Sequence, residues 1–126
     1  MSLFKKLFIA FLAFLAIKDL SLGLSLLFNL EWLLNLAKMQ YSEDVKITAS
    51  FFGVCVLIVS TLCVLAIKWN LKDKAEGVVL GKFIGWWMII AAIIVYIKID
   101  KLNYSIIDFI SGLLIVIPGY LLAKKN

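Results

Sequence analysis

The sequence predicts an all-α integral membrane protein, an antiparallel four-helix bundle with a short interfacial helix after the first span. Of its 126 residues, 64% are hydrophobic, and the mean hydropathy is +1.07. A soluble domain of this size has too little interior to bury so much apolar surface. Four stretches each approach the roughly 20 apolar residues that cross a hydrocarbon core. The loops between them are short, so we expect neighbouring spans to be adjacent and antiparallel.

The first span is predicted at 7–27, directly after Lys5 and Lys6. This start resembles a secretory signal peptide, but no convincing cleavage site follows, so we expect the helix to be retained. Residues 30–39, LEWLLNLAKM, predict a short amphipathic helix at the membrane surface, with Trp32 at headgroup level. The alternative is that the first span continues into water as one long helix.

Three further spans complete a single transmembrane domain over residues 1–126. They are predicted at 47–67, 77–97 and 105–123, and the charged turns 68–76 and 100–104 separate them. Cys55 and Cys63 fall on the second span, about 12 Å apart along its axis, which is too far for a disulfide. We therefore interpret both cysteines as small apolar side chains.

The charged residues are 13 lysines and 8 acids, and the chain has no arginine and no histidine. The lysines gather at the ends of spans, which is typical of membrane flanks and not of a surface that binds nucleic acid. The absence of histidine removes the commonest metal ligand and general base, and the absence of arginine removes the bidentate phosphate clamp. The sequence therefore predicts no enzymatic activity, no metal and no cofactor.

The distribution of lysines also predicts the orientation, because cytoplasmic flanks carry the excess of positive charge. Four lysines fall on one side of the predicted bundle, Lys38, Lys46, Lys98 and Lys101, and seven on the other, Lys5, Lys6, Lys68, Lys72, Lys74, Lys124 and Lys125. Both termini and the 68–76 turn are therefore expected in the cytoplasm.

Polar residues interrupt the first span. Lys18, Ser21, Ser25 and Asn29 share one arc of a helix, and Asp19 lies about 100° to one side. A charge at the bilayer centre costs about 2.5–3.5 kcal/mol on insertion scales, so such residues are expected to face the bundle interior and find partners.

Asp108, on the small-residue face of the fourth span, is the predicted partner of Lys18. Asp19 would then be neutral or hydrogen-bonded, with an Asp19–Lys82 pair as the alternative. These charges form either a structural latch between helices or part of a polar path through the membrane, and the sequence leaves both interpretations open.

Small residues predict where the helices pack. Gly77, Gly81 and Gly85 follow each other at intervals of four on the third span, and Gly112 lies on the small-residue face of the fourth. We expect these faces to pack within the chain, with homodimerisation as the alternative. Lys82 lies between two of these glycines and is expected to reach the cytoplasmic headgroups and bind anionic lipid, or else an anionic small molecule.

The layout resembles small, uncharacterised bacterial membrane proteins of the DoxX-like type with four transmembrane helices. The resemblance lies in FN-x-EWL at 28–33, FFGV at 51–54, LGK-x-x-G at 80–85, Asp108, and the Pro118 to Tyr120 segment. Leu30 replaces the proline that usually precedes EW in such proteins. The resemblance implies the four-helix architecture and a place in the bacterial inner membrane, and it implies no particular chemistry.

The function expected from these observations is that of an accessory or structural subunit. Its partners would be membrane lipid and a second copy or a larger membrane complex, but not nucleic acid. The alternative is a small-solute, ion or lipid transporter that uses Lys18, Asp19 and Asp108.

Overall fold

The computed structural model describes residues 2–99 and 105–125, and this part of the chain is all-helical, without a strand. Five helices follow one another: α1 (Leu3–Phe28), α2 (Leu30–Ala37), α3 (Glu43–Leu71), α4 (Ala75–Ile99) and α5 (Ile106–Lys125). The all-α prediction is confirmed. The helices α1, α3 and α4 extend beyond the predicted spans at both ends, and the added turns include charged residues of the flanks, such as Lys5, Glu43 and Lys98.

Among the described residues, three helical segments are long and apolar enough to cross a membrane, and a fourth apolar segment, Ile106–Leu122, is shorter. The three are Leu3–Phe28, Glu43–Leu71 and Ala75–Lys98. In the most apolar part of each, no more than 33% of the residues are buried inside the protein. Most of their apolar side chains therefore face outward.

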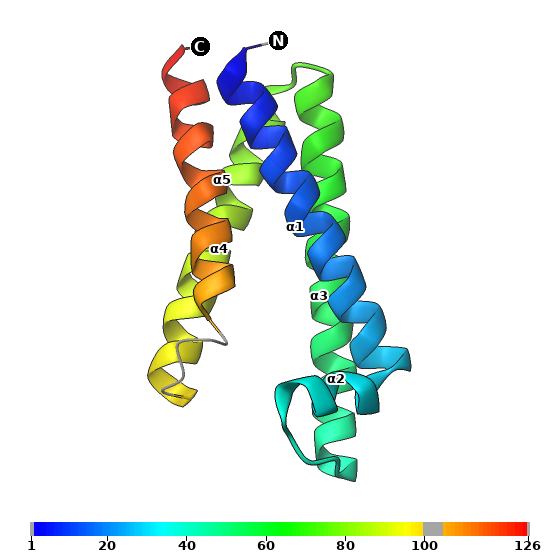
Figure 1. The fold of residues 1–126 in the computed structure, drawn as a ribbon. Helices are drawn as coiled ribbons and strands as arrows, with labels where there is room; N and C mark the ends of the chain where they lie inside the picture. Colours follow the sequence, from blue (N-terminus) through cyan, green and yellow to red (C-terminus); the bar gives the residue numbers. More distant parts are fainter. Residues whose placement is uncertain (1, 100–104, 126) are drawn as a thin grey trace. The chain divides into compact units, whose positions relative to one another are not determined.

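The chain divides into two compact units. The first unit contains Met1–Leu15 and Leu62–Asn126, and the second contains Ala16–Thr61. In the first unit, α4 and α5 lie side by side and antiparallel. The start of α1, the α3–α4 turn and the end of α5 lie together at one end of this unit (Figure 1).

Glycines bring the helices of the first unit close together. A Cβ atom on Gly112 would lie 2.6 Å from the Gly85 carbonyl oxygen, so the backbones of α5 and α4 are in contact. A Cβ on Gly81 would overlap the ring of Phe8, and one on Gly119 would lie 3.1 Å from that ring. The fully buried Phe8 side chain of α1 therefore occupies the space left by two glycines.

In the second unit, α1 and α3 also meet at glycines. A Cβ on Gly23 would lie 3.0 Å from the Gly53 carbonyl oxygen, and a Cβ on Gly53 would lie 3.2 Å from that of Gly23. The hydroxyl of Ser60 donates a 2.8 Å hydrogen bond to the carbonyl of Ala16. The contact between α1 and α3 therefore combines a close backbone approach with an interhelical hydrogen bond.

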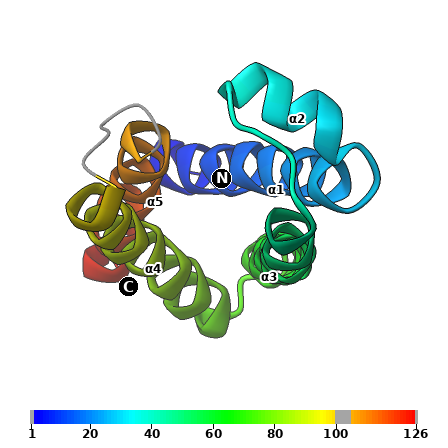
Figure 2. The ribbon, with the colours of Figure 1, turned by 90° about the horizontal axis from the view of Figure 1, so that it is seen from below.

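A break at Asn29 separates α2 from α1, and α2 turns away from the axis of α1 (Figure 2). The first span therefore does not continue as one long helix. At its other end α2 stops at Lys38, whose φ is 57°. The Met39 N–H bonds to the Leu34 carbonyl, and the Lys38 N–H bonds to that of Asn35, which is the Schellman pattern of helix termination.

Candidate functional site

Lys18 and Asp19 form an ion pair in α1, with Nζ and Oδ1 3.6 Å apart. The Asp19 residue is only 4% exposed, and the Lys18 side chain is partly buried. Consecutive helix residues point in different directions, so this is a loose contact. It nevertheless places two opposite charges inside a helix that is otherwise almost entirely apolar.

The remaining residues predicted for this polar site are distributed over both units. Ser21 is exposed and Ser25 half-buried on α1, whereas Asp108 is half-buried in the first turn of α5. Because Lys18 and Asp108 belong to different units, their predicted pairing stays a prediction. The same holds for the alternative pair of Asp19 with Lys82.

Lys82 contacts an aromatic pair in the first unit. Its Nζ lies 4.7 Å from the centroid of the Tyr120 ring, within the range of a cation–π interaction. The indole N–H of Trp86 donates a 3.0 Å hydrogen bond to the Tyr120 hydroxyl. A Cβ on Gly119 would lie 2.6 Å from the Lys82 Cγ, so the lysine stem lies directly on α5. The aromatic contact was not predicted from the sequence.

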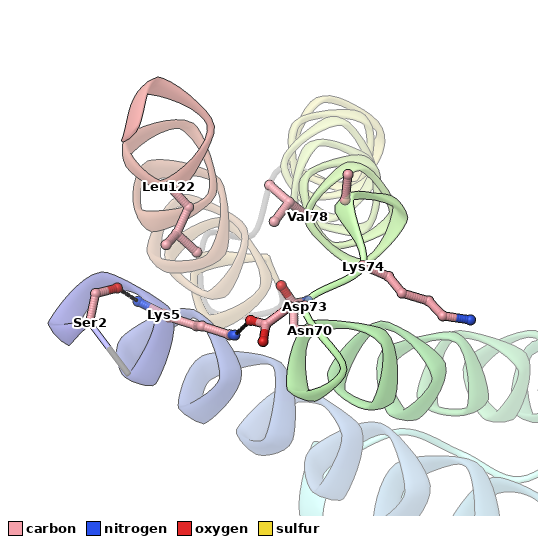
Figure 3. Close-up of a pocket in the computed structure, with 8 residues that line it drawn as sticks. Ser2, Lys5, Asn70, Asp73, Lys74, Val78 and Leu122 are labelled. Atoms are coloured by element: carbon pink, nitrogen blue, oxygen red, sulfur yellow. Dashed lines mark hydrogen bonds and ion pairs between the residues drawn. The ribbon is translucent and has the colours of Figure 1, made fainter. Parts of the chain in front are cut away.

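A cavity of about 400 Å³ lies at the end of the first unit where α1 begins and α3 turns into α4 (Figure 3). We call it the end cavity. Its lining residues are Ser2, Lys5, Asn70, Asp73, Lys74, Ala75, Val78 and Leu122. Polar groups from α1 and from the α3–α4 turn therefore meet apolar side chains of α4 and α5.

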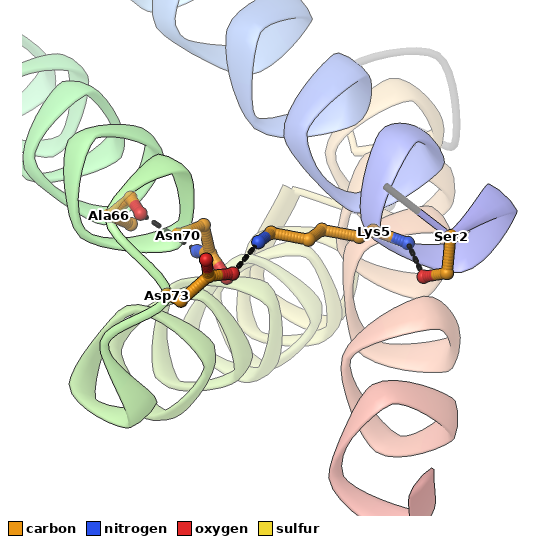
Figure 4. A network of polar contacts seen from close by, with 5 residues as sticks. All are labelled: Ser2, Lys5, Ala66, Asn70 and Asp73. Atoms are coloured by element: carbon orange, nitrogen blue, oxygen red, sulfur yellow. Dashed lines mark hydrogen bonds and ion pairs between the residues drawn. The ribbon is translucent and has the colours of Figure 1, made fainter. Parts of the chain in front are cut away.

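The polar side of the end cavity contains an ion pair between Lys5 and Asp73 (Figure 4). The Lys5 side chain is 18% exposed and that of Asp73 is 81% exposed. The hydrogen bond and the charge of Lys5 hold the pKa of Asp73 below its ordinary value of 3.8. The pair links the start of α1 to the α3–α4 turn.

Asp73 reaches this position because α3 ends in a second Schellman pattern. Its φ is 57°, its N–H bonds to the Asn70 carbonyl, and the Lys74 N–H bonds to the Trp69 carbonyl. Asn70 is only 2% exposed, and its side-chain amide donates a 2.7 Å hydrogen bond to the Ala66 carbonyl. A Cβ on Gly77 would lie 2.7 Å from the backbone nitrogen of Asn70. The absence of a side chain at Gly77 therefore lets α4 start directly against the end of α3.

Lys5, Asn70 and Asp73 were not selected from the sequence as site residues. The available signal was the lysine count, which placed Lys5 and the 68–76 turn on the same side of the membrane. That count contains no information on which helix end faces which turn.

Among the residues that the structure describes, no group of three or more cysteine, aspartate or glutamate side chains is placed to hold a metal ion. Cys55 is exposed and Cys63 is buried, and neither forms a disulfide.

Comparison with family models, curated proteins and solved structures finds no match to this chain. The DoxX-like resemblance therefore stays a prediction.

Proposed function

We propose that the protein is a small multi-pass membrane protein that acts as an accessory or structural subunit. In this proposal α1, α3, α4 and α5 form a four-helix bundle in the bilayer, and α2 lies at its surface. The single observation that supports it best is the outward-facing apolar surface of the long helices.

Large apolar side chains are exposed along every long helix. Examples are Phe14 on α1, Phe51 on α3, Phe83 on α4 and Ile117 on α5, all more than half exposed. Leaving such a side chain in water instead of burying it costs about 1.5–3 kcal/mol each. Hydrocarbon around the helices removes this cost, and water does not.

The short helix α2 supports an interfacial placement. Leu34 is buried against the protein, whereas Trp32 and Leu36 are exposed beside the polar Glu31 and Asn35. An exposed tryptophan on an amphipathic helix is typical of the headgroup region.

The proposed location is the bacterial inner membrane with both termini in the cytoplasm. The Lys5–Asp73 pair supports the part of this topology that puts the start of α1 and the 68–76 turn on the same side of the membrane, and the lysine excess assigns that side to the cytoplasm.

Membrane placement is tested by alkaline carbonate extraction of cell membranes. We expect the protein to remain in the pellet, as helices that span a bilayer do, and recovery in the supernatant would contradict the proposal. A single cysteine introduced at each terminus is then labelled in inside-out and in right-side-out vesicles. The vesicle type in which the cysteine is accessible reports the orientation.

The accessory role is tested by substitution of the intramembrane charges. We expect Lys18→Leu, Asp19→Asn and Asp108→Asn to change the yield of folded protein and the recovery of one copurifying membrane partner. Purified protein in liposomes should move no proton, ion or lipid.

A transporter is the second candidate, and the buried Lys18–Asp19 pair is the observation that favours it. Intramembrane acids frequently serve ion and proton pathways. Proton or ion flux in liposomes that Asp19→Asn abolishes, at unchanged folded yield, would support this candidate and overturn the accessory role.

A further inference from the structure

The end cavity contains a hydrogen-bond acceptor with unused capacity. The side-chain nitrogen of Asn70 donates to the Ala66 carbonyl, which fixes the orientation of the amide because a carbonyl cannot donate. The Asn70 side-chain oxygen receives no hydrogen bond from any residue that the structure describes. Among the described residues no unpaired side-chain oxygen is fully enclosed, so the Asn70 oxygen is open to the cavity and can accept a hydrogen bond from a donor that enters it.

The ion pair in the same cavity also has unused capacity. An ammonium group has three N–H donors, and Lys5 uses one of them on Asp73. A carboxylate can accept several hydrogen bonds, so Asp73 can bind a second donor. The Lys74 ammonium group points away from the cavity (Figure 3), so the cavity presents the Lys5 cation beside two acceptors, and the charges of Lys5 and Asp73 balance.

A ligand with charges of both signs fits this set better than an ion of one sign. A simple anion would be attracted to Lys5 but repelled by Asp73, and it would leave the Asn70 oxygen unpaired. A simple cation would leave the donors of Lys5 unused. A primary ammonium group joined to a phosphate offers donors to Asn70 and Asp73 and acceptors to Lys5.

The other wall of the cavity is apolar and consists of Ala75, Val78 and Leu122. It lies at the end of the helices, where the proposed membrane placement puts the phospholipid headgroups. A volume of about 400 Å³ accommodates one headgroup with the start of its glycerol.

We propose that the end cavity binds the headgroup of a zwitterionic phospholipid with a primary amine, which places the amine between Asn70 and Asp73 and the phosphate on Lys5. The inference rests on the proposed membrane placement and names a specific ligand class for it.

Native mass spectrometry of the purified protein tests the proposal with three added lipids of matched chain length. Phosphatidylethanolamine has the primary amine, phosphatidylcholine has a quaternary amine without N–H donors, and phosphatidylglycerol has no amine. We expect about tenfold higher occupancy by phosphatidylethanolamine than by either other lipid. Equal occupancy by the three would overturn the proposal.

Substitutions then locate the site. Lys5→Met, Asn70→Leu and Asp73→Asn should each reduce phosphatidylethanolamine occupancy about tenfold. Val78→Phe fills the cavity from its apolar wall without changing a polar group and should have the same effect. The matched controls Lys6→Met and Asp44→Asn change exposed residues outside the cavity and should leave occupancy unchanged.

Only variants that unfold cooperatively, with a thermal midpoint well above the temperature of the binding measurement, are scored. Unchanged occupancy in Asp73→Asn and Val78→Phe would overturn the site.

Free phosphoethanolamine separates a lipid from a soluble source of the same chemistry. It lacks the glycerol that would lie on Val78 and Leu122, so at equal concentration it should displace little lipid. Full displacement would overturn the lipid assignment in favour of a soluble phosphoamine.

Carbonate extraction of the same variants tests the membrane placement independently of lipid binding. Protein that stays in the membrane without preferring phosphatidylethanolamine refutes this site alone. Protein that is released refutes the proposed membrane placement.

Discussion

Lys38 and Asp73 both have a φ of 57°, in the left-handed region that favours glycine. Each follows the last turn of a helix, and the following residue, Met39 or Lys74, closes a Schellman pattern. A residue with a Cβ atom costs about 1–2 kcal/mol in this conformation. The two helix ends therefore retain side chains at a cost in stability, and at Asp73 the retained side chain pairs with Lys5.

At Lys38 no side-chain hydrogen bond or ion pair with another described residue offsets this cost, and Lys38→Gly is expected to stabilise the end of α2. Relief of the backbone cost exceeds the larger entropy of an unfolded glycine, so we expect a gain of about 0.5–1 kcal/mol. Hydrogen exchange at the Lys38 and Met39 amides measures it. Lys38→Ala keeps the Cβ atom and should give no gain, and an equal gain in both variants would contradict the explanation.

At Asp73 the ion pair predicts a dependence of stability on pH. The folded pKa is lowered by Lys5, so the pair contributes fully above the ordinary value of 3.8 and is lost as the pH falls through the lowered folded value. The midpoint of thermal unfolding in detergent should be higher for wild type than for Asp73→Asn at neutral pH. This difference should vanish in acid and shrink at high salt, because Asp73 is largely exposed. Asparagine also tolerates the left-handed conformation, so the backbone is held constant.

The helices meet where the sequence lacks side chains, at Gly85 with Gly112 between α4 and α5, and at Gly23 with Gly53 between α1 and α3. In lipid, such close approach replaces the hydrophobic effect as a source of helix association. The spacing of Gly77, Gly81 and Gly85 indicated a packing face. It could not assign each glycine its own neighbour, which is the end of α3, Phe8 and α5 respectively.

Gly112→Ala is expected to destabilise the α4–α5 contact. Its Cβ would lie 2.6 Å from the Gly85 carbonyl oxygen and from an Ile89 side-chain carbon, and the backbone oxygen cannot move aside cheaply. We expect a loss of about 1–3 kcal/mol in the free energy of unfolding. Reversible unfolding in mixed micelles measures it. Leu114→Ala, at an exposed position on the same helix, is the control and should change stability far less.

Between α1 and α3, Ser60→Ala removes the hydrogen bond to the Ala16 carbonyl. Interhelical hydrogen bonds in membrane proteins contribute about 0.6 kcal/mol on average, so we expect a loss of that size in the same unfolding assay. A loss several times larger would show that the hydroxyl does more than bridge the two helices. Thr61→Val is the control, because the Thr61 hydroxyl bonds within its own helix.

For the whole chain, the apolar stretches predicted the long helices well, because length and hydropathy are local properties. The break before Leu30 was also predictable from the change to an amphipathic pattern. The contact of Lys5 with Asp73 was not predictable, because it depends on which helix end lies next to which turn in the folded chain. Lys82 was selected from its glycine neighbours, but its contact with Tyr120 joins residues 38 positions apart and has no local signature.

Orientation is a property of the whole chain and depends on the lysine excess. Replacing Lys68, Lys72 and Lys74 by glutamine leaves four lysines on each side, so we expect a mixture of orientations. Labelling of Glu76→Cys in a Cys55→Ser, Cys63→Ala background measures the fraction on each face. Replacing Lys38 and Lys98 instead enlarges the excess and should leave one orientation, and a mixture there would contradict the assignment.

The Phe8 ring fills the volume that Gly81 and Gly119 leave open, so these three positions share a fixed amount of space. A larger residue at 81 is then tolerable only with a smaller one at 8. In homologous chains, a larger residue at position 81 should therefore occur together with a smaller residue at position 8. In this chain, Phe8→Leu should restore the folding that Gly81→Ala alone impairs.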